Sequence, residues 1–156
     1  MNLVDNLALG FSTALSLQNL FFCFLGVIIG TLVGVLPGIS PLNTTAMLLP
    51  FTFGLPPASA MIMLAGIFYG AQYGGSTTAI LVNVPGETSA VVTCLDGYQM
   101  ARQGRAGPAL AIAATGSFFA GTVATIVIAM LSAPLAALAM QFTAPEYFCL
   151  LVMGLI

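Results

Sequence analysis

The chain of 156 residues has no histidine, no lysine and no tryptophan, and charged side chains make up only 4% of it. Histidine is the commonest general base and metal ligand, so its absence argues against an enzyme and against a metal site. A basic nucleic-acid patch cannot be built from two arginines, Arg102 and Arg105. The sequence shows neither a Ser–Lys set nor paired carboxylates. It therefore predicts no enzymatic activity and no cofactor.

Cysteine is equally scarce. Cys23, Cys94 and Cys149 are scattered, odd in number and form no C-x-x-C pair. Such a pattern supports neither a disulfide framework nor a zinc site, and small apolar packing residues are the better interpretation.

Apolar residues dominate what remains. They form 60% of the chain, and charged residues form 4%, whereas about 25% of the residues of an average soluble domain are charged. So few ionic groups cannot cover a surface in water, and burial must therefore be against lipid. The 17 glycines and 9 prolines argue against plain rods. The predicted fold class is an all-α integral membrane protein, a polytopic bundle with interrupted, half-length helices and an internal repeat.

Glycine, proline and hydrophobicity divide the chain into segments. The expected order is an interface helix over 3–17, a span over 20–36, an interrupted-helix motif over 37–53, an apolar segment over 58–73, a second interrupted-helix motif over 74–86, a cytoplasmic-side helix and loop over 88–107, and a span over 109–131. The apolar run over 147–156 supplies about half of a span, so we expect the front part of a longer protein.

Two features of these segments concern packing and orientation. Gly26, Gly30 and Gly34 recur every fourth residue, which predicts close approach of another helix to that face. The helix predicted over 88–102 is expected to end at Gly104, where glycine is common. Arg102 and Arg105 carry the only positive side-chain charges, so their loop is predicted to be cytoplasmic. Residues 1–17 have no basic n-region and carry Asp5, and therefore do not form a signal peptide.

The two interrupted-helix motifs resemble each other, because NTTAMLLP (43–50) has nearly the shape of STTAILVN (76–83). In the first motif, Pro37 and Gly38 end a helix, and Ser40 is a favoured N-cap before a proline at the first helical position. The short helix that follows is roughly 13 Å long, against a hydrocarbon core of roughly 30 Å. It therefore crosses only about half of the core.

The second motif is predicted to repeat this arrangement. Gly74 and Gly75 loosen the backbone, Ser76 caps a short helix, and Pro85 with Gly86 ends it. Interrupted helices are tolerated in membranes only inside protein or beside a wet cavity, and secondary transporters use them at substrate sites.

We infer from the sequence that two helix N-termini face one pocket and hold an anion there, without a buried lysine or arginine. The candidate substrate-binding residues are Ser40, Asn43, Thr44, Thr45, Gly74, Gly75, Ser76, Thr77, Thr78 and Asn83, and the helix-breaking residues are Pro37, Gly38, Pro85 and Gly86.

Alternatives stand beside this hypothesis. Serine and threonine in membrane helices often bond only to their own backbone at i−4. Glu87 is either a first-turn carboxylate favoured by the helix dipole or a titratable coupling group. For the whole chain, the alternative to transport is a non-transporting helical membrane scaffold. A channel is less well supported, since no ring of charges or filter-like sequence is present.

Three strings carry a resemblance to a known family: LPGISPLNTTAMLLPFTFGL, YGGSTTAILVNVPGE and LDGYQMARQGRAGPALAIAATGSFFAGT. They resemble the large membrane subunit of the tripartite tricarboxylate transporter family, from about residue 27 to 122. The resemblance assigns all the candidate binding and helix-breaking residues except Pro37 to the family's two motifs. It also implies that the family's large subunit is several times longer than this chain.

The resemblance implies a multi-pass permease of the bacterial inner membrane that takes up citrate or related carboxylates. It would work with a small membrane subunit and a periplasmic solute-binding protein, driven by an ion gradient. The coupling ion stays open between Na⁺, held by carbonyl, threonine or asparagine oxygens, and a proton carried by Glu87.

Overall fold

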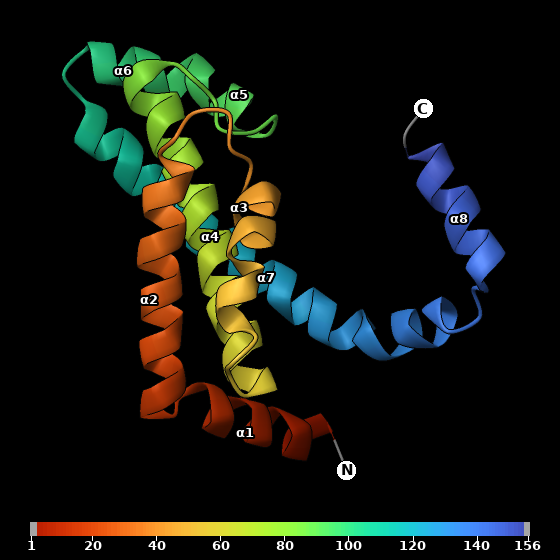
Figure 1. The fold of residues 1–156 in the computed structure, drawn as a ribbon. Coiled ribbons are helices and arrows are strands. Elements are labelled where there is room, and N and C mark those ends of the chain that lie inside the picture. The colour runs from red at the N-terminus through yellow and green to blue at the C-terminus, as the bar shows by residue number, and fades with distance from the viewer. Residues whose placement is uncertain (1–2, 155–156) are drawn as a thin grey trace. The chain divides into compact units, whose positions relative to one another are not determined.

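The computed structural model describes residues 3–154, and every regular element in this range is helical, which confirms the all-α class. The chain forms two compact units, a first unit of residues 1–114 and a second unit of residues 115–156. The elements, shown in Figure 1, are α1 (Leu3–Ala14), α2 (Leu17–Gly34), α3 (Pro41–Leu48), the 3₁₀ turn η1 (Leu49–Thr52), α4 (Pro57–Val82), α5 (Ala90–Thr93), the π turn η2 (Cys94–Tyr98), α6 (Gln99–Arg102), α7 (Ala106–Ala139) and α8 (Ala144–Met153).

Two of these helices are long and apolar enough to cross a membrane. They are α2 and the part of α7 from Ala106 to Ser132, where the sequence places its two spans. Large apolar side chains on α7, such as Phe118 and Phe119, are about 70% exposed within the structure. Exposed apolar surface on this scale is rare on soluble monomers, so lipid or further protein has to cover it.

The first unit is organised by the contact between α2 and α4, which lie side by side and run in the same direction (Figure 1). Gly26, Gly30 and Gly34 of α2 are buried against the backbone of α4. A Cβ atom on Gly30 would lie 2.2 Å from the carbonyl oxygen of Ile67, and one on Gly34 would lie 2.3 Å from that of Ala71. The helices therefore touch backbone to backbone, as the spacing on α2 predicts.

The contact is reciprocal, because α4 carries a matching glycine face. A Cβ on Gly66 would lie 2.7 Å from the carbonyl oxygen of Cys23, and one on Gly70 would lie 2.4 Å from that of Val27. Gly74 meets the carboxyl end of α2, where an added Cβ would lie 2.7 Å from the carbonyl carbon of Gly34. The spacing of glycines on α2 predicted only one half of this packing.

The predicted second short helix is wrong. α4 runs without interruption for 26 residues, through Gly74 and Gly75, and Ser76 is an interior residue rather than an N-cap. A glycine in a helix interior costs only about 1 kcal/mol relative to alanine. Here that cost is offset because the missing side chains admit α2. The segment predicted over 58–73 and most of the motif over 74–86 are therefore one helix, and the two motifs do not share a conformation.

Other boundaries differ less. α7 extends from Ala106 to Ala139 and includes Pro134, so it exceeds the predicted span over 109–131 at both ends. The predicted helix over 88–102 is present as α5, η2 and α6 in succession. Gly104 ends it with φ +77°, while the Arg105 N–H donates to the Met100 carbonyl at 2.9 Å. This is the glycine-terminated cap that the sequence predicts at that position.

A buried polar cluster joins the start of α2 to α1 and α4. Asn19, only 6% exposed, donates from its side chain to the Thr13 carbonyl at 2.7 Å. Its side-chain oxygen accepts a hydrogen bond from Ser59 Oγ at 2.6 Å. Because both ends of the Asn19 amide are satisfied, the cluster stabilises this corner rather than offering a free polar group.

We expect Gly30→Ala to lower the free energy of unfolding by about 1–3 kcal/mol, because the added methyl group overpacks a backbone contact. Thermal unfolding of the full-length protein in detergent measures this. Gly10→Ala is the control, since an added Cβ there meets nothing within 4 Å; it should be neutral or stabilise by roughly 0.5–1 kcal/mol. Equal melting temperatures for Gly30→Ala and wild type would contradict the packing.

Candidate functional site

The first motif forms a capped helix start. Gly38 adopts φ +88° in the turn after α2, a conformation that glycine tolerates without strain. Ser40 then caps α3: its Oγ accepts from the Asn43 N–H at 3.2 Å, and its carbonyl accepts from the Thr44 N–H at 3.0 Å. Pro41 occupies the first helical position and is buried. Local sequence therefore places an amide-rich helix end at residues 40–43.

Few donors remain free at this end of α3. Pro41 has no N–H, and the Asn43 N–H is taken by the Ser40 hydroxyl. This leaves the Leu42 N–H, the exposed Asn43 carboxamide and the positive end of the helix dipole. The first motif can thus contribute to an anion site, but among the described residues it does not enclose one.

The hydroxyl groups of both motifs donate to their own helices. Thr44 donates to the Ser40 carbonyl at 3.1 Å, Thr45 to Pro41 at 2.8 Å, Ser76 to Gln72 at 3.2 Å, Thr77 to Tyr73 at 2.9 Å and Thr78 to Gly75 at 2.9 Å. A hydroxyl has one proton and two lone pairs, so each can now only accept a hydrogen bond from a ligand. In this conformation Thr44, Thr45, Ser76 and Thr77 follow the i−4 alternative, and Thr78 bonds one residue closer, at i−3.

The second motif ends in a loop that folds back on its own helix. Asn83, at φ 59°, is the left-handed C-cap of α4. Gly86 then packs on Gly75 so closely that a Cβ on Gly86 would lie 2.8 Å from the Gly75 Cα. This contact brings the Glu87 carboxylate to α4, where Oε1 accepts hydrogen bonds from Gln72 Nε2 and Ser89 Oγ.

Sequence reasoning did not identify Gln72. The available signal was a carboxamide in an apolar helix, one turn before Ser76 and therefore on the same face. What the sequence could not supply is the fold-back of the loop, which makes Gln72 the partner of Glu87.

The two motifs lie at the same level of the first unit. α3 runs antiparallel to α4 (Figure 1), and Leu48 lines the same groove as Met63 and Ile67. The step from Leu48 back to Pro41 equals the step from Ile67 on to Gly74, about 10 Å of helix. The start of α3 therefore lies near the level of Gly74, where α2 also ends.

Two hollows of the first unit are poorly suited to a carboxylate. The groove between α2, α3 and α4, of about 350 Å³, is lined by apolar side chains. A second hollow, of about 240 Å³, between α4, the α5–α6 segment and the start of α7, includes Asp96, whose charge would repel an anion. Within residues 3–154 there is also no group of three His, Cys, Asp or Glu side chains that could hold a metal ion.

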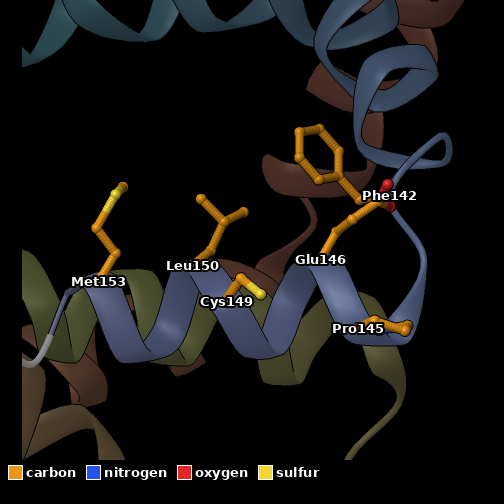
Figure 2. Close-up of a pocket in the computed structure, with 6 residues that line it drawn as sticks. All are labelled: Phe142, Pro145, Glu146, Cys149, Leu150 and Met153. Atoms are coloured by element: carbon orange, nitrogen blue, oxygen red, sulfur yellow. The ribbon is translucent and has the colours of Figure 1, made fainter.

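A third hollow, of about 340 Å³, lies in the second unit along α8 (Figure 2). Phe142, Pro145, Glu146, Cys149, Leu150 and Met153 line it. Its one charged group is already used: Glu146 accepts from the Thr143 N–H and hydroxyl as a capping box. The hydrogen bond from the Thr143 backbone lowers the pKa of Glu146 below its ordinary value. The hollow therefore lies at the start of α8, and the groups that line it are mainly apolar.

The fold defines a class. The regular elements of residues 3–154 are all helices, two of them long and apolar enough to cross a membrane, as in an α-helical membrane protein. Residues 20–156 match the tripartite tricarboxylate transporter TctA family, and the chain belongs to that family. This is a transporter family rather than an enzyme family, which confirms the absence of enzymatic activity predicted above.

The chain spans about a third of the length of a curated relative that it matches. An uncharacterized 52.8 kDa protein in the TAR-I ttuC′ 3′ region of Agrobacterium vitis is 64% identical over 156 residues. The match covers 100% of this chain and 31% of that protein. No solved structure matches the chain.

Replacing the α3 cap tests the first motif. We expect Ser40→Ala to destabilise the start of α3 by about 1 kcal/mol, whereas Ser40→Asp should keep the cap. Hydrogen exchange at residues 42–45 should become roughly fivefold faster in Ser40→Ala. Ser12→Ala, which removes an exposed hydroxyl from α1, should leave these amides unchanged. Unaltered exchange in Ser40→Ala would contradict the capping role.

Proposed function

We propose that this chain is part of the membrane permease subunit of a secondary active, binding-protein-dependent transporter for tricarboxylates or related carboxylates. The observation that carries the proposal is the family match over residues 20–156. Because the chain spans only about a third of its relative's length, transport belongs to the whole protein. An ion gradient drives uptake, and a small membrane subunit and a periplasmic solute-binding protein complete the system in the bacterial inner membrane.

Within this proposal, the start of α3 supplies donors to the substrate. The Asn43 carboxamide is exposed and the Leu42 N–H lies at the positive end of the helix. The two hollows of the first unit are lined mainly by apolar side chains, so the remaining donors come from the rest of the subunit. Such a shared site is typical of transporters in which discontinuous helices meet near the bilayer midplane.

One observation favours the alternative, a membrane scaffold, for part of the sequence. The glycine faces of α2 and α4 pack against each other, and the Thr77 and Thr78 hydroxyls donate hydrogen bonds to carbonyl groups of their own helix. These residues contribute to packing under either function. The two hypotheses separate at Asn43, which contributes no side-chain hydrogen bond seen here and would matter only to a ligand.

We expect Asn43→Ala to reduce carboxylate uptake by roughly tenfold or more, because a hydrogen bond to a charged group contributes about 1.5–3 kcal/mol. The measurement is uptake of labelled di- and tricarboxylates, citrate included, by the complete transporter with its partner subunits. Asn6→Ala, at an exposed position of α1, is the control and should transport normally. Normal uptake by Asn43→Ala at wild-type expression would remove α3 from the substrate site.

The orientation proposed from Arg102 and Arg105 is testable by labelling. In a protein lacking Cys23, Cys94 and Cys149, a Gln103→Cys variant should react with a membrane-impermeant maleimide in inside-out vesicles but not in right-side-out ones. Gln103 is exposed in the turn after α6, so access by the reagent is not limited by packing. Labelling from the outer face would reverse the assigned orientation.

A further inference from the structure

The Glu87 carboxylate is held in a defined place. The loop after α4 is pinned by the contact of Gly86 with Gly75, and Glu87 is half-buried behind it. Gln72 and Ser89 both donate to the same carboxylate oxygen, Oε1. Two donors converging on one oxygen orient the group and leave Oε2 as its unshared acceptor.

This negative charge has no counter-charge nearby. Both donors are neutral, and the hydrogen bonds and contacts of residues 3–154 include no ion pair at Glu87. The chain's two arginines are exposed, Arg102 as the last residue of α6 and Arg105 in the turn that follows. A half-buried carboxylate in a membrane protein is costly when unpaired, and such groups usually face a partner or an ion.

The neighbouring polar atoms are acceptors. Gln72 uses its side-chain NH₂ on Glu87, and its side-chain oxygen Oε1 keeps its lone pairs as an acceptor. Ser76 lies one turn further on the same helix face and donates its only proton to the backbone carbonyl of Gln72. The lone pairs of its hydroxyl oxygen therefore remain available as acceptors. The end of α2 adds to this, because the Gly34 carbonyl oxygen lies 3.8 Å from a Cβ position on Gly86 and belongs to the negative end of its helix.

We propose that Glu87, Gln72 and Ser76 form a binding site for one alkali cation, Na⁺, which their oxygen atoms coordinate. Oxygen ligands suit a hard cation, and the single negative charge of this set matches a monovalent one. The role of this cation as coupling ion rests on the transport function proposed above. The site changes the expected role of Ser76 from anion donor to cation ligand.

The test is the effect of Na⁺ on the thermal stability of purified full-length protein in detergent, at fixed pH and fixed ionic strength with choline chloride as the substitute salt. A ligand that binds the folded state raises the melting temperature in a concentration-dependent way. Wild type should show a saturable rise with NaCl. Glu87→Gln should lose this rise, and Ser76→Ala and Gln72→Leu should need at least tenfold more NaCl for half of it.

The controls separate binding from folding. Ser12→Ala removes a hydroxyl on α1 and should keep the wild-type Na⁺ response. Should Glu87→Gln not fold, Glu87→Asp keeps the charge but shortens the side chain, and its half-saturating NaCl concentration should rise at least tenfold. A wild-type response to Na⁺ in Glu87→Gln, an unshifted midpoint in Glu87→Asp, or a wild type that responds to pH but not to Na⁺ would overturn the site.

A second measurement distinguishes this inference from the transport proposal. If the complete transporter carries no carboxylate under any ion gradient, while Na⁺ still stabilises wild type and not Glu87→Gln, the transport function fails and the cation site stands. If carboxylate uptake is normal but the Na⁺ response does not depend on Glu87, the transport function stands and the cation site is wrong.

Discussion

The backbone-to-backbone contact between α2 and α4 is the constraint on which the first unit depends. In lipid there is no hydrophobic force between helices, so association rests on van der Waals packing and hydrogen bonds. Glycines at every fourth position on both helices, such as Gly30 and Gly70, let the backbones touch. Because the contact reaches Gly34 and Gly74, it also determines where the first motif leaves α2 and where the loop after α4 can return.

This geometry makes the two similar strings chemically different. NTTA lies in the first turn of a helix, where the Leu42 N–H, the Asn43 carboxamide and the positive end of the helix dipole are available to an anion. STTA lies inside a helix whose backbone is satisfied, and its hydroxyls present lone pairs beside a carboxylate. The two motifs therefore present groups of opposite polarity, with donors at the start of α3 and acceptors on α4.

Local features of the structure followed from the sequence. The Ser40 cap, the Gly104 helix end and the glycine face of α2 each depend on a few neighbouring residues with specific backbone preferences. The continuity of α4 did not follow, because a Gly-Gly pair is compatible with a break or with close packing. The role of Gln72 could not be predicted for a related reason, because its partner Glu87 reaches it only where the loop folds back at Gly86.

The sequence by itself determined the all-helical class, the membrane character, the family and the start of α3, because composition, periodicity and capping act over short distances. Only the tertiary structure decided that Gly74 and Gly75 continue a helix and that Glu87 meets Gln72. A glycine is compatible both with a bend in a helix and with close packing of a second backbone. Here α2 and the returning loop occupy the space beside the two glycines, which selects close packing.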